Sequence, residues 1–143
     1  MNAISFTVPG RPVPKGRPRV TRYGTYNPKA TQLYEKAVRD AWKAQSGKSF
    51  PGGVPLAVYV GVHFEIPRSL SKKQRLALEG QPHTKQRGDL DNVVKSVLDA
   101  LNGAAFPDDA AVCTVFAYKD FRAVPSTKVI IMEYKEDLYE RRF

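Results

Sequence analysis

Four carboxylates stand close together in the sequence and offer its most specific chemistry. Asp89 and Asp91 are separated by one residue, and the pair Asp108 and Asp109 follows after an apolar segment and a glycine. Carboxylate oxygens suit Mg²⁺ or Mn²⁺, and such an ion can polarise a phosphate and activate water. Lys95, one helical turn after Asp91, could hydrogen-bond a developing phosphorane oxygen or orient the attacking water. The set indicates metal-assisted hydrolysis of a phosphodiester.

A structural explanation of these residues stays open. Acidic residues favour the first turn of a helix because they cap its free amides and complement its dipole. An ion pair between Asp91 and Lys95 would contribute only about 0.2–0.5 kcal/mol. An EF-hand is excluded, because Val94 and Ala100 stand where that loop requires glycine and glutamate. P-loop, GxGxxG, zinc-ligand and Ser-His-Asp patterns do not occur either.

The segment that carries the first aspartates has the pattern of a half-buried helix. At 3.6 residues per turn, Asp91, Asn92, Lys95 and Asp99 fall opposite an apolar stripe. The stripe consists of Leu90, Val93, Val94, Val97, Leu98 and Leu101. Inside this helix Asp89 would project away from Asp91, whereas as an N-cap it could approach Asp91.

The remaining segments predict a mixed α/β fold. Strands are expected at residues 3–8, 56–66, 111–121 and 127–134, with the last two forming an antiparallel hairpin. A long helix begins at Asn27-Pro28, and a short helix follows a capping box of Ser71 and Gln74. We expect one domain over residues 1–143, with a sheet of about four strands flanked by two main helices and one short helix.

Several side chains are interpreted as structural. The long helix carries an apolar stripe of Ala30, Leu33, Tyr34, Ala37, Val38, Ala41 and Trp42, which places the tryptophan in the core. Cys113 lies in an apolar stretch and is expected to be a buried core residue. His63 and Glu65 share one face of their strand, where a partly exposed sheet face is favoured over a metal site.

Positive charge dominates the chain, with 23 Lys and Arg against 14 Asp and Glu and a formal net charge of +9. This excess indicates a nucleic-acid partner before an anionic membrane, since no apolar run is long enough to span a bilayer. The N-terminus lacks the pattern of a secretory signal, so a cytoplasmic location is expected.

Residues at about 10–27 form a basic arm that is rich in proline and glycine and contains no acidic residue. Tyr23 and Tyr26 lie among its cations and suit stacking on bases or sugars. A merely solvated loop is the alternative. The candidate DNA-binding residues are Lys15, Arg17, Arg19 and Arg22 in the arm, and Lys72, Lys73, Lys85 and Arg87 ahead of the aspartates.

The run DLDNVVKSVLDALNG from Asp89 to Gly103, followed by Asp108-Asp109, resembles the RusA family of Holliday junction resolvases. These are small endodeoxyribonucleases of bacteria and their phages. The resemblance implies a homodimeric, Mg²⁺-dependent enzyme that binds four-way DNA junctions and makes paired nicks. It implies metal ligation by Asp89, Asp91 and Asp109, with Lys95 as an electrostatic helper. Asp108 competes with Asp109 for the third ligand position.

Three functions remain distinguishable at this point. The main hypothesis is a metal-dependent resolvase of DNA recombination and repair, using Mg²⁺ or alternatively Mn²⁺. A non-catalytic nucleic-acid-binding protein is the first alternative, and a nuclease of the same fold acting on flaps or other branched DNA is the second. The opening PGRPVPKGRPRV has a larger basic content than the family pattern leads us to expect, so junction selectivity is less firmly indicated than nuclease chemistry. Origin from a bacterium or a prophage is left open.

Overall fold

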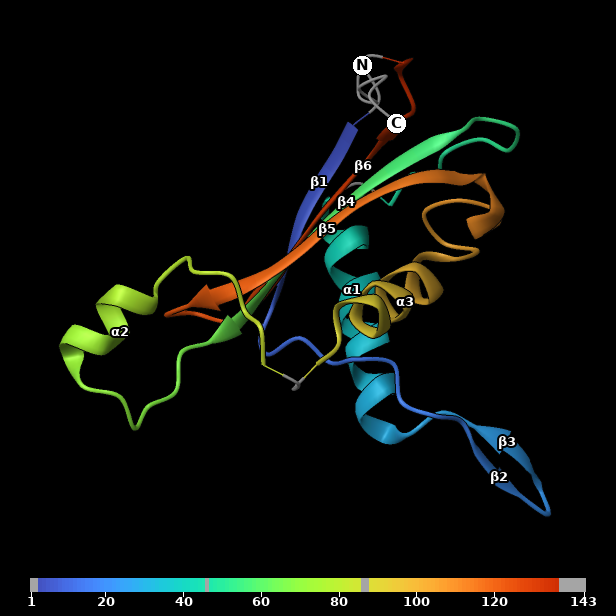
Figure 1. The fold of residues 1–143 in the computed structure, drawn as a ribbon. Coiled ribbons are helices and arrows are strands. Elements are labelled where there is room, and N and C mark those ends of the chain that lie inside the picture. The colour runs from blue at the N-terminus through green and yellow to red at the C-terminus, as the bar shows by residue number, and fades with distance from the viewer. Residues whose placement is uncertain (1–2, 46, 86–87, 137–143) are drawn as a thin grey trace.

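The computed structural model describes residues 3–45, 47–85 and 88–136. A four-stranded sheet in the order β1-β6-β4-β5 carries α1 and α3 on one face, and α2 lies apart near one end of the sheet (Figure 1). The sheet strands are β1 (Ala3–Pro9), β4 (Leu56–Glu65), β5 (Val112–Arg122) and β6 (Ser126–Glu133), and the helices are α1 (Lys29–Gln45), α2 (Lys72–Leu78) and α3 (Leu90–Leu101). The predicted mixed α/β fold is confirmed.

The core lies between the helices and the helix-facing side of the sheet. Alternate residues of β4, from Leu56 to Phe64, are buried there, as the period of two predicts. Trp42 is 4% exposed and belongs to this core, as expected. The buried stripe of α1 is rotated from the predicted one, because Leu33 is 58% exposed and Thr31 is buried. Thr31 lies under the N-terminal segment, whose Gly16 amide donates to its hydroxyl.

The predicted hairpin between the last two strands is wrong. In the sheet, β4 lies between β5 and β6, parallel to β5 and antiparallel to β6. The connection of residues 123–125 therefore crosses the end of β4 instead of forming a hairpin turn. Its short length suggested a hairpin, yet the apolar β4 takes the central position, where both of its edges are hydrogen-bonded.

Two side chains of the sheet differ from expectation, namely Cys113 on β5 and His63 on the face away from the helices. Cys113 is exposed, so its assignment to the core is wrong. It lies at the irregular start of the edge strand β5, where a register shift interrupts the pairing with β4. His63 is buried, and its Nδ1 lies 2.6 Å from a carboxylate oxygen of Asp120. The same face is partly exposed farther along, since Phe116 is 46% exposed.

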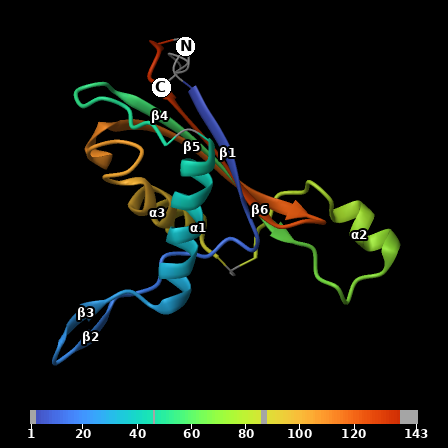
Figure 2. The same cartoon turned by 180° about the vertical axis from the view of Figure 1, so that it is seen from behind.

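The basic arm contains a small hairpin where a loop was expected. Its strands, β2 (Arg19–Thr21) and β3 (Gly24–Tyr26), extend away from the body of the domain (Figures 1 and 2). The Thr21 hydroxyl accepts from the Tyr23 amide and donates to the Gly24 carbonyl, which closes the turn. All six strand residues are exposed, so the hairpin is held without a core of its own.

α2 begins as the sequence indicates but packs less than a helix usually does. The Ser71 hydroxyl accepts from the Gln74 amide and the Gln74 side chain accepts from the Ser71 amide, which confirms the capping box. No residue of α2 is buried. Across the described ranges, no helix has both the length and the apolar character needed to traverse a bilayer.

Candidate functional site

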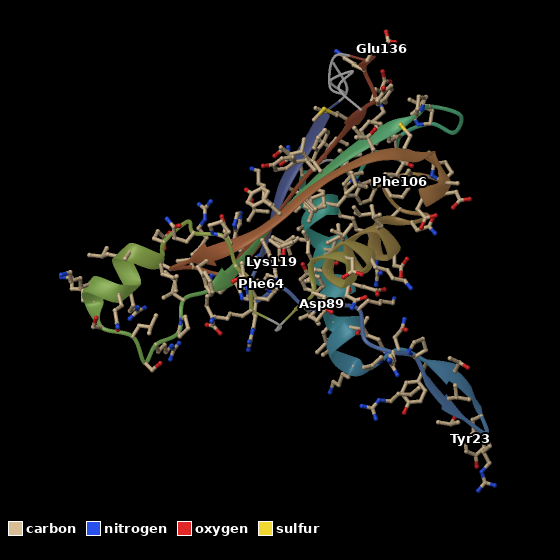
Figure 3. The ribbon with its side chains drawn as sticks, in the orientation of Figure 1. Tyr23, Phe64, Asp89, Phe106, Lys119 and Glu136 are labelled. Carbon is tan, nitrogen blue, oxygen red and sulfur yellow. The ribbon has the colours of Figure 1, made fainter. Side chains whose placement is uncertain are left out.

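The start of α3 is fixed by a glycine packed against an aromatic ring. Gly88 adopts a φ of +76°, and a Cβ at this position would overlap the ring of Phe64. The Asp89 carbonyl accepts from the amides of Asn92 and Val93 and opens the helix. Asp89 is thus the N-cap residue, one of the positions that the sequence left open, but its side chain makes no capping hydrogen bond. Its carboxylate is exposed beside Phe64 (Figure 3).

Asp91 and Lys95 lie on the exposed side of α3. Both side chains are exposed, and Asp91 occupies the first helical turn. The salt bridges found in the described residues do not include a pair between them. Neither capping by Asp89 nor the ion pair therefore accounts for these residues, and all three charged groups are accessible to an external ligand.

Asp109 opens the short helix η1 (Asp109–Ala111), which lies at the carboxyl-terminal end of α3. Its backbone amide donates to the Asn102 side chain over 3.2 Å. Asp108 caps η1, because its carboxylate accepts from the Ala110 amide. Burial raises the pKa of Asp109, and the hydrogen bond and charge of Asp108 and the charge of Asp99 raise it further. This end of α3 therefore gathers negative charge.

The two acidic ends of α3 are separated along the helix. From Asp91 to Asn102 the axial rise is about 16 Å at 1.5 Å per residue. Within residues 3–45, 47–85 and 88–136, no three His, Cys, Asp or Glu side chains lie close enough to hold a metal ion together. The structure brings Asp89 and Asp91 to one end and leaves Asp109 at the other. A shared role for all three stays a prediction.

Lys15 has partners inside the protein that its sequence position does not reveal. Its ammonium lies 2.6 Å from Glu35 and 3.0 Å from Asp99, and its side chain is 12% exposed. Its backbone amide donates to the Asn92 carbonyl over 2.8 Å. Burial acts to lower the pKa of Lys15, but the two carboxylates outweigh it and raise the pKa. Lys15 anchors the base of the arm to α1 and α3, and we do not place it among the DNA contacts.

Most of the other candidate DNA-binding cations are exposed. Arg17, Arg19 and Arg22 lie along the arm, Lys72 and Lys73 lie on α2, and Lys85 lies in the segment before α3. Arg87 falls outside the described residues. At the tip of the hairpin, Tyr23 is 89% exposed and the Arg22 guanidinium lies 5.4 Å from its ring centre. The arm thus presents cations and an accessible aromatic ring together.

The chain is a small α/β domain. It has accessible carboxylates at a helix start and exposed cations on both sides of them, which are features of a domain that processes nucleic acids. Comparison with known proteins narrows this class. The family model described as Endodeoxyribonuclease RusA matches residues 9–132. The uncharacterized protein YqaN of Bacillus subtilis (strain 168) is 32% identical over 140 residues, which cover 93% of this chain and 98% of the relative. The chain belongs to the RusA family of endodeoxyribonucleases.

Proposed function

We propose that this chain is a Mg²⁺-dependent, structure-selective endodeoxyribonuclease that resolves Holliday junctions by paired nicks in recombination and repair. The observation that carries the proposal is the start of α3, where Asp89 and Asp91 are exposed and neither is used in capping or in an ion pair with Lys95. Family membership supports the nuclease chemistry. A cytoplasmic location, where chromosomal or prophage DNA is accessible, belongs to the same proposal.

The carboxylates at this helix start fit Mg²⁺, with Mn²⁺ as an alternative ion. Mg²⁺ is commonly held by one or two carboxylates together with water and substrate phosphate oxygens. Asp89 and Asp91 would supply those carboxylates. When bound, the ion supplies Lewis-acid polarisation of the scissile phosphate and activation of water. Asp109 is the proposed third ligand, although its side chain belongs to the other end of α3.

The surrounding cations would bind and orient the substrate. Lys95, one turn after Asp91, would donate to a phosphate oxygen that gains charge during cleavage. The arm arginines and the lysines of α2 flank the acidic site and would hold phosphates of the junction arms. These contacts offset the repulsion between phosphate and the exposed aspartates.

We further propose that the chain acts as a homodimer, since paired nicks require two sites. The sheet face away from the helices supports this, because it exposes Phe116 and Tyr118 to solvent at 46% and 36%. Sedimentation of the whole chain should give twice the mass of one chain. A monomer that still makes paired nicks would remove this part of the proposal.

The decisive experiment is cleavage of a labelled mobile four-way junction by Asp89→Asn and Asp91→Asn. Each variant should lose Mg²⁺-dependent nicking by more than the roughly 10- to 100-fold typical of losing a residue that supports a metal ligand. Junction binding should stay the same or strengthen, because a negative charge facing phosphate is removed. The matched control is Asp40→Asn, an exposed aspartate of α1 paired with Lys36.

Variants that nick as fast as the parent would show that the aspartates are structural and would favour a non-catalytic binding protein. Flap and duplex DNA tested in the same assay distinguish the substrates. Faster cleavage of a flap than of the four-way junction would show that the enzyme is a nuclease of the same chemistry whose substrate is another branched DNA.

A further inference from the structure

A hollow of about 990 Å³ adjoins the proposed catalytic end of α3. It lies where β4 ends and a lobe of residues 66–85, which contains α2, leaves the sheet. Its apolar walls come from Phe64, Ile66, Leu70, Leu78 and Phe121. The Phe64 ring in this wall is also the ring packed against Gly88, the residue that precedes Asp89.

One wall of the hollow is a stack of aromatic rings. The His83 ring lies 4.3 Å from that of Phe121 at an angle of 16°, and 4.9 Å from that of Phe64. Its backbone amide donates to the Lys119 carbonyl, and its Nδ1 accepts from the Lys85 amide. Burial lowers the pKa of His83, and the charge of Lys119 lowers it further. Both effects favour the neutral imidazole, which forms part of the wall between Phe64 and Phe121.

The rim of the hollow is cationic. Arg11, Arg68 and Lys85 line it together with one acidic residue, Glu65, which lies 3.9 Å from the Arg11 guanidinium. A second copy of a chain with a net charge of +9 would meet repulsion at this rim, whereas DNA would be attracted. An apolar hollow with a cationic rim matches a nucleotide, in which an apolar base face is joined to a phosphate.

We propose that the hollow receives one unstacked nucleobase of the strand whose phosphate lies at Asp89. The base would lie against the apolar walls, while Arg68 and Lys85 contact the flanking phosphates. Glu65 at the mouth can accept a hydrogen bond from the N3–H group of thymine, or from an exocyclic amino group of another base. This inference rests on the proposed function, because it assumes that the Asp89 end of α3 receives DNA.

The test compares two leucines of α2 that lie on different sides of that helix. Leu78 lines the hollow, whereas Leu76 does not line it and is 70% exposed. Neither residue is buried, so Leu78→Asn and the control Leu76→Asn both leave the core intact. Binding is measured without divalent metal, by fluorescence anisotropy of the whole chain with labelled oligothymidylate of about 12 nucleotides, within the usual site size. An abasic strand of the same length is the second probe.

Leu78→Asn should weaken binding of oligothymidylate by about tenfold, the loss of one base contact, and leave binding of the abasic strand unchanged. Leu76→Asn should change neither, and stacking on the arm tyrosines contributes equally to all three proteins. Arg68→Ala should weaken both probes, while the control Lys36→Ala, an exposed cation of α1 outside the hollow, should weaken them less.

Three results would overturn the inference. These are an unchanged affinity of Leu78→Asn for oligothymidylate, an equal loss for both probes, or a change in sedimentation mass that marks the hollow as a subunit contact. Thermal unfolding of each variant identifies a folding defect, and the same comparison with the smaller change Leu78→Val then applies. Because no metal or cleavage enters this assay, failure of the nuclease proposal would appear separately, as absent nicking by the parent protein.

Discussion

Replacing Lys15 by methionine isolates the contact that anchors the basic arm. Methionine keeps most of the length of the side chain and removes its charge, so Glu35 and Asp99 lose their common cation. Truncating one partner of a buried ion pair costs about 3–5 kcal/mol, whereas an exposed pair contributes about 0.2–1 kcal/mol. The side chains of Lys15 and Glu35 are each 12% exposed and that of Asp99 is 32% exposed. We therefore expect a loss of about 2 kcal/mol in the free energy of unfolding, between those limits.

The assay is urea and thermal unfolding of the parent and Lys15→Met. A loss of this size corresponds to a decrease of about 6–8 °C in Tm for a chain of this length. Lys36→Met is the matched control, because the pair of Lys36 with Asp40 is 67% and 55% exposed and should contribute less than about 0.5 kcal/mol. The double variant Lys15→Met with Glu35→Gln should lose less free energy of unfolding than the sum of the losses in the two single variants.

The stabilising contribution of Lys15 depends on pH in a defined direction. Carboxylate partners raise the pKa of Lys15 in the folded protein, so its stabilising contribution is complete below the ordinary lysine pKa of about 10.4. The contribution is lost as the pH rises through the raised value. The stability difference between parent and Lys15→Met should therefore be constant near pH 7 and disappear only at strongly alkaline pH.

DNA binding separates this structural role from a phosphate contact. Each phosphate contact adds about 0.9 to the slope of log K against log salt concentration. If Lys15→Met lowers that slope by about 0.9 while its Tm matches the parent, Lys15 contacts DNA and the ion pairs contribute little. A lower Tm with an unchanged slope is the result we expect.

Three further predictions concern the arm, the acidic end of α3 and the edge strand β5. Arg17→Ala combined with Arg19→Ala should reduce the salt slope of junction binding by nearly 2, and an unchanged slope would make the arm a solvated loop. Asp109→Asn should raise Tm at pH 7 and lose that advantage at acidic pH, because the raised pKa of Asp109 marks its ionised form as destabilised beside Asp108. Cys113 should react with a thiol reagent in the folded protein without prior unfolding, and protection until unfolding would contradict its exposure.

The local elements were predictable because their signals are local. The capping box of Ser71 and Gln74 and the apolar alternation of β4 are each contained within a few residues. The predicted apolar stripe of α3 does face the core. Ser96 and Ala100 are also buried on that side of the helix, and Leu90 is only half-buried. Helix and strand periods report which face is covered, and they did so correctly for β4 and α3, whereas the buried stripe of α1 was rotated from the predicted one.

Two of the errors concern which segments become neighbours in the sheet. A short link between β5 and β6 suggests a hairpin, but the position of β4 between them depends on the sheet as a whole. Cys113 has apolar neighbours in the sequence, yet it lies on an edge strand where a register shift begins. Both outcomes depend on pairing with distant segments, so a short stretch of sequence does not show which strands become neighbours.

The role of Lys15 near the candidate site also depends on contacts with segments that are distant in the sequence. In the sequence it is one more cation of a basic arm, and its pairing with Asp99 depends on packing of the arm against α3. Asp99 in turn raises the pKa of Asp109 by its charge. Removing the Lys15 cation should therefore leave Asp99 uncompensated and raise the pKa of Asp109 further. The Lys15 anchor of the arm and the acidic end of α3 are thus coupled through the Asp99 carboxylate. NMR titration of Asp109 in the parent and in Lys15→Met measures this coupling as a shift in the pKa of Asp109.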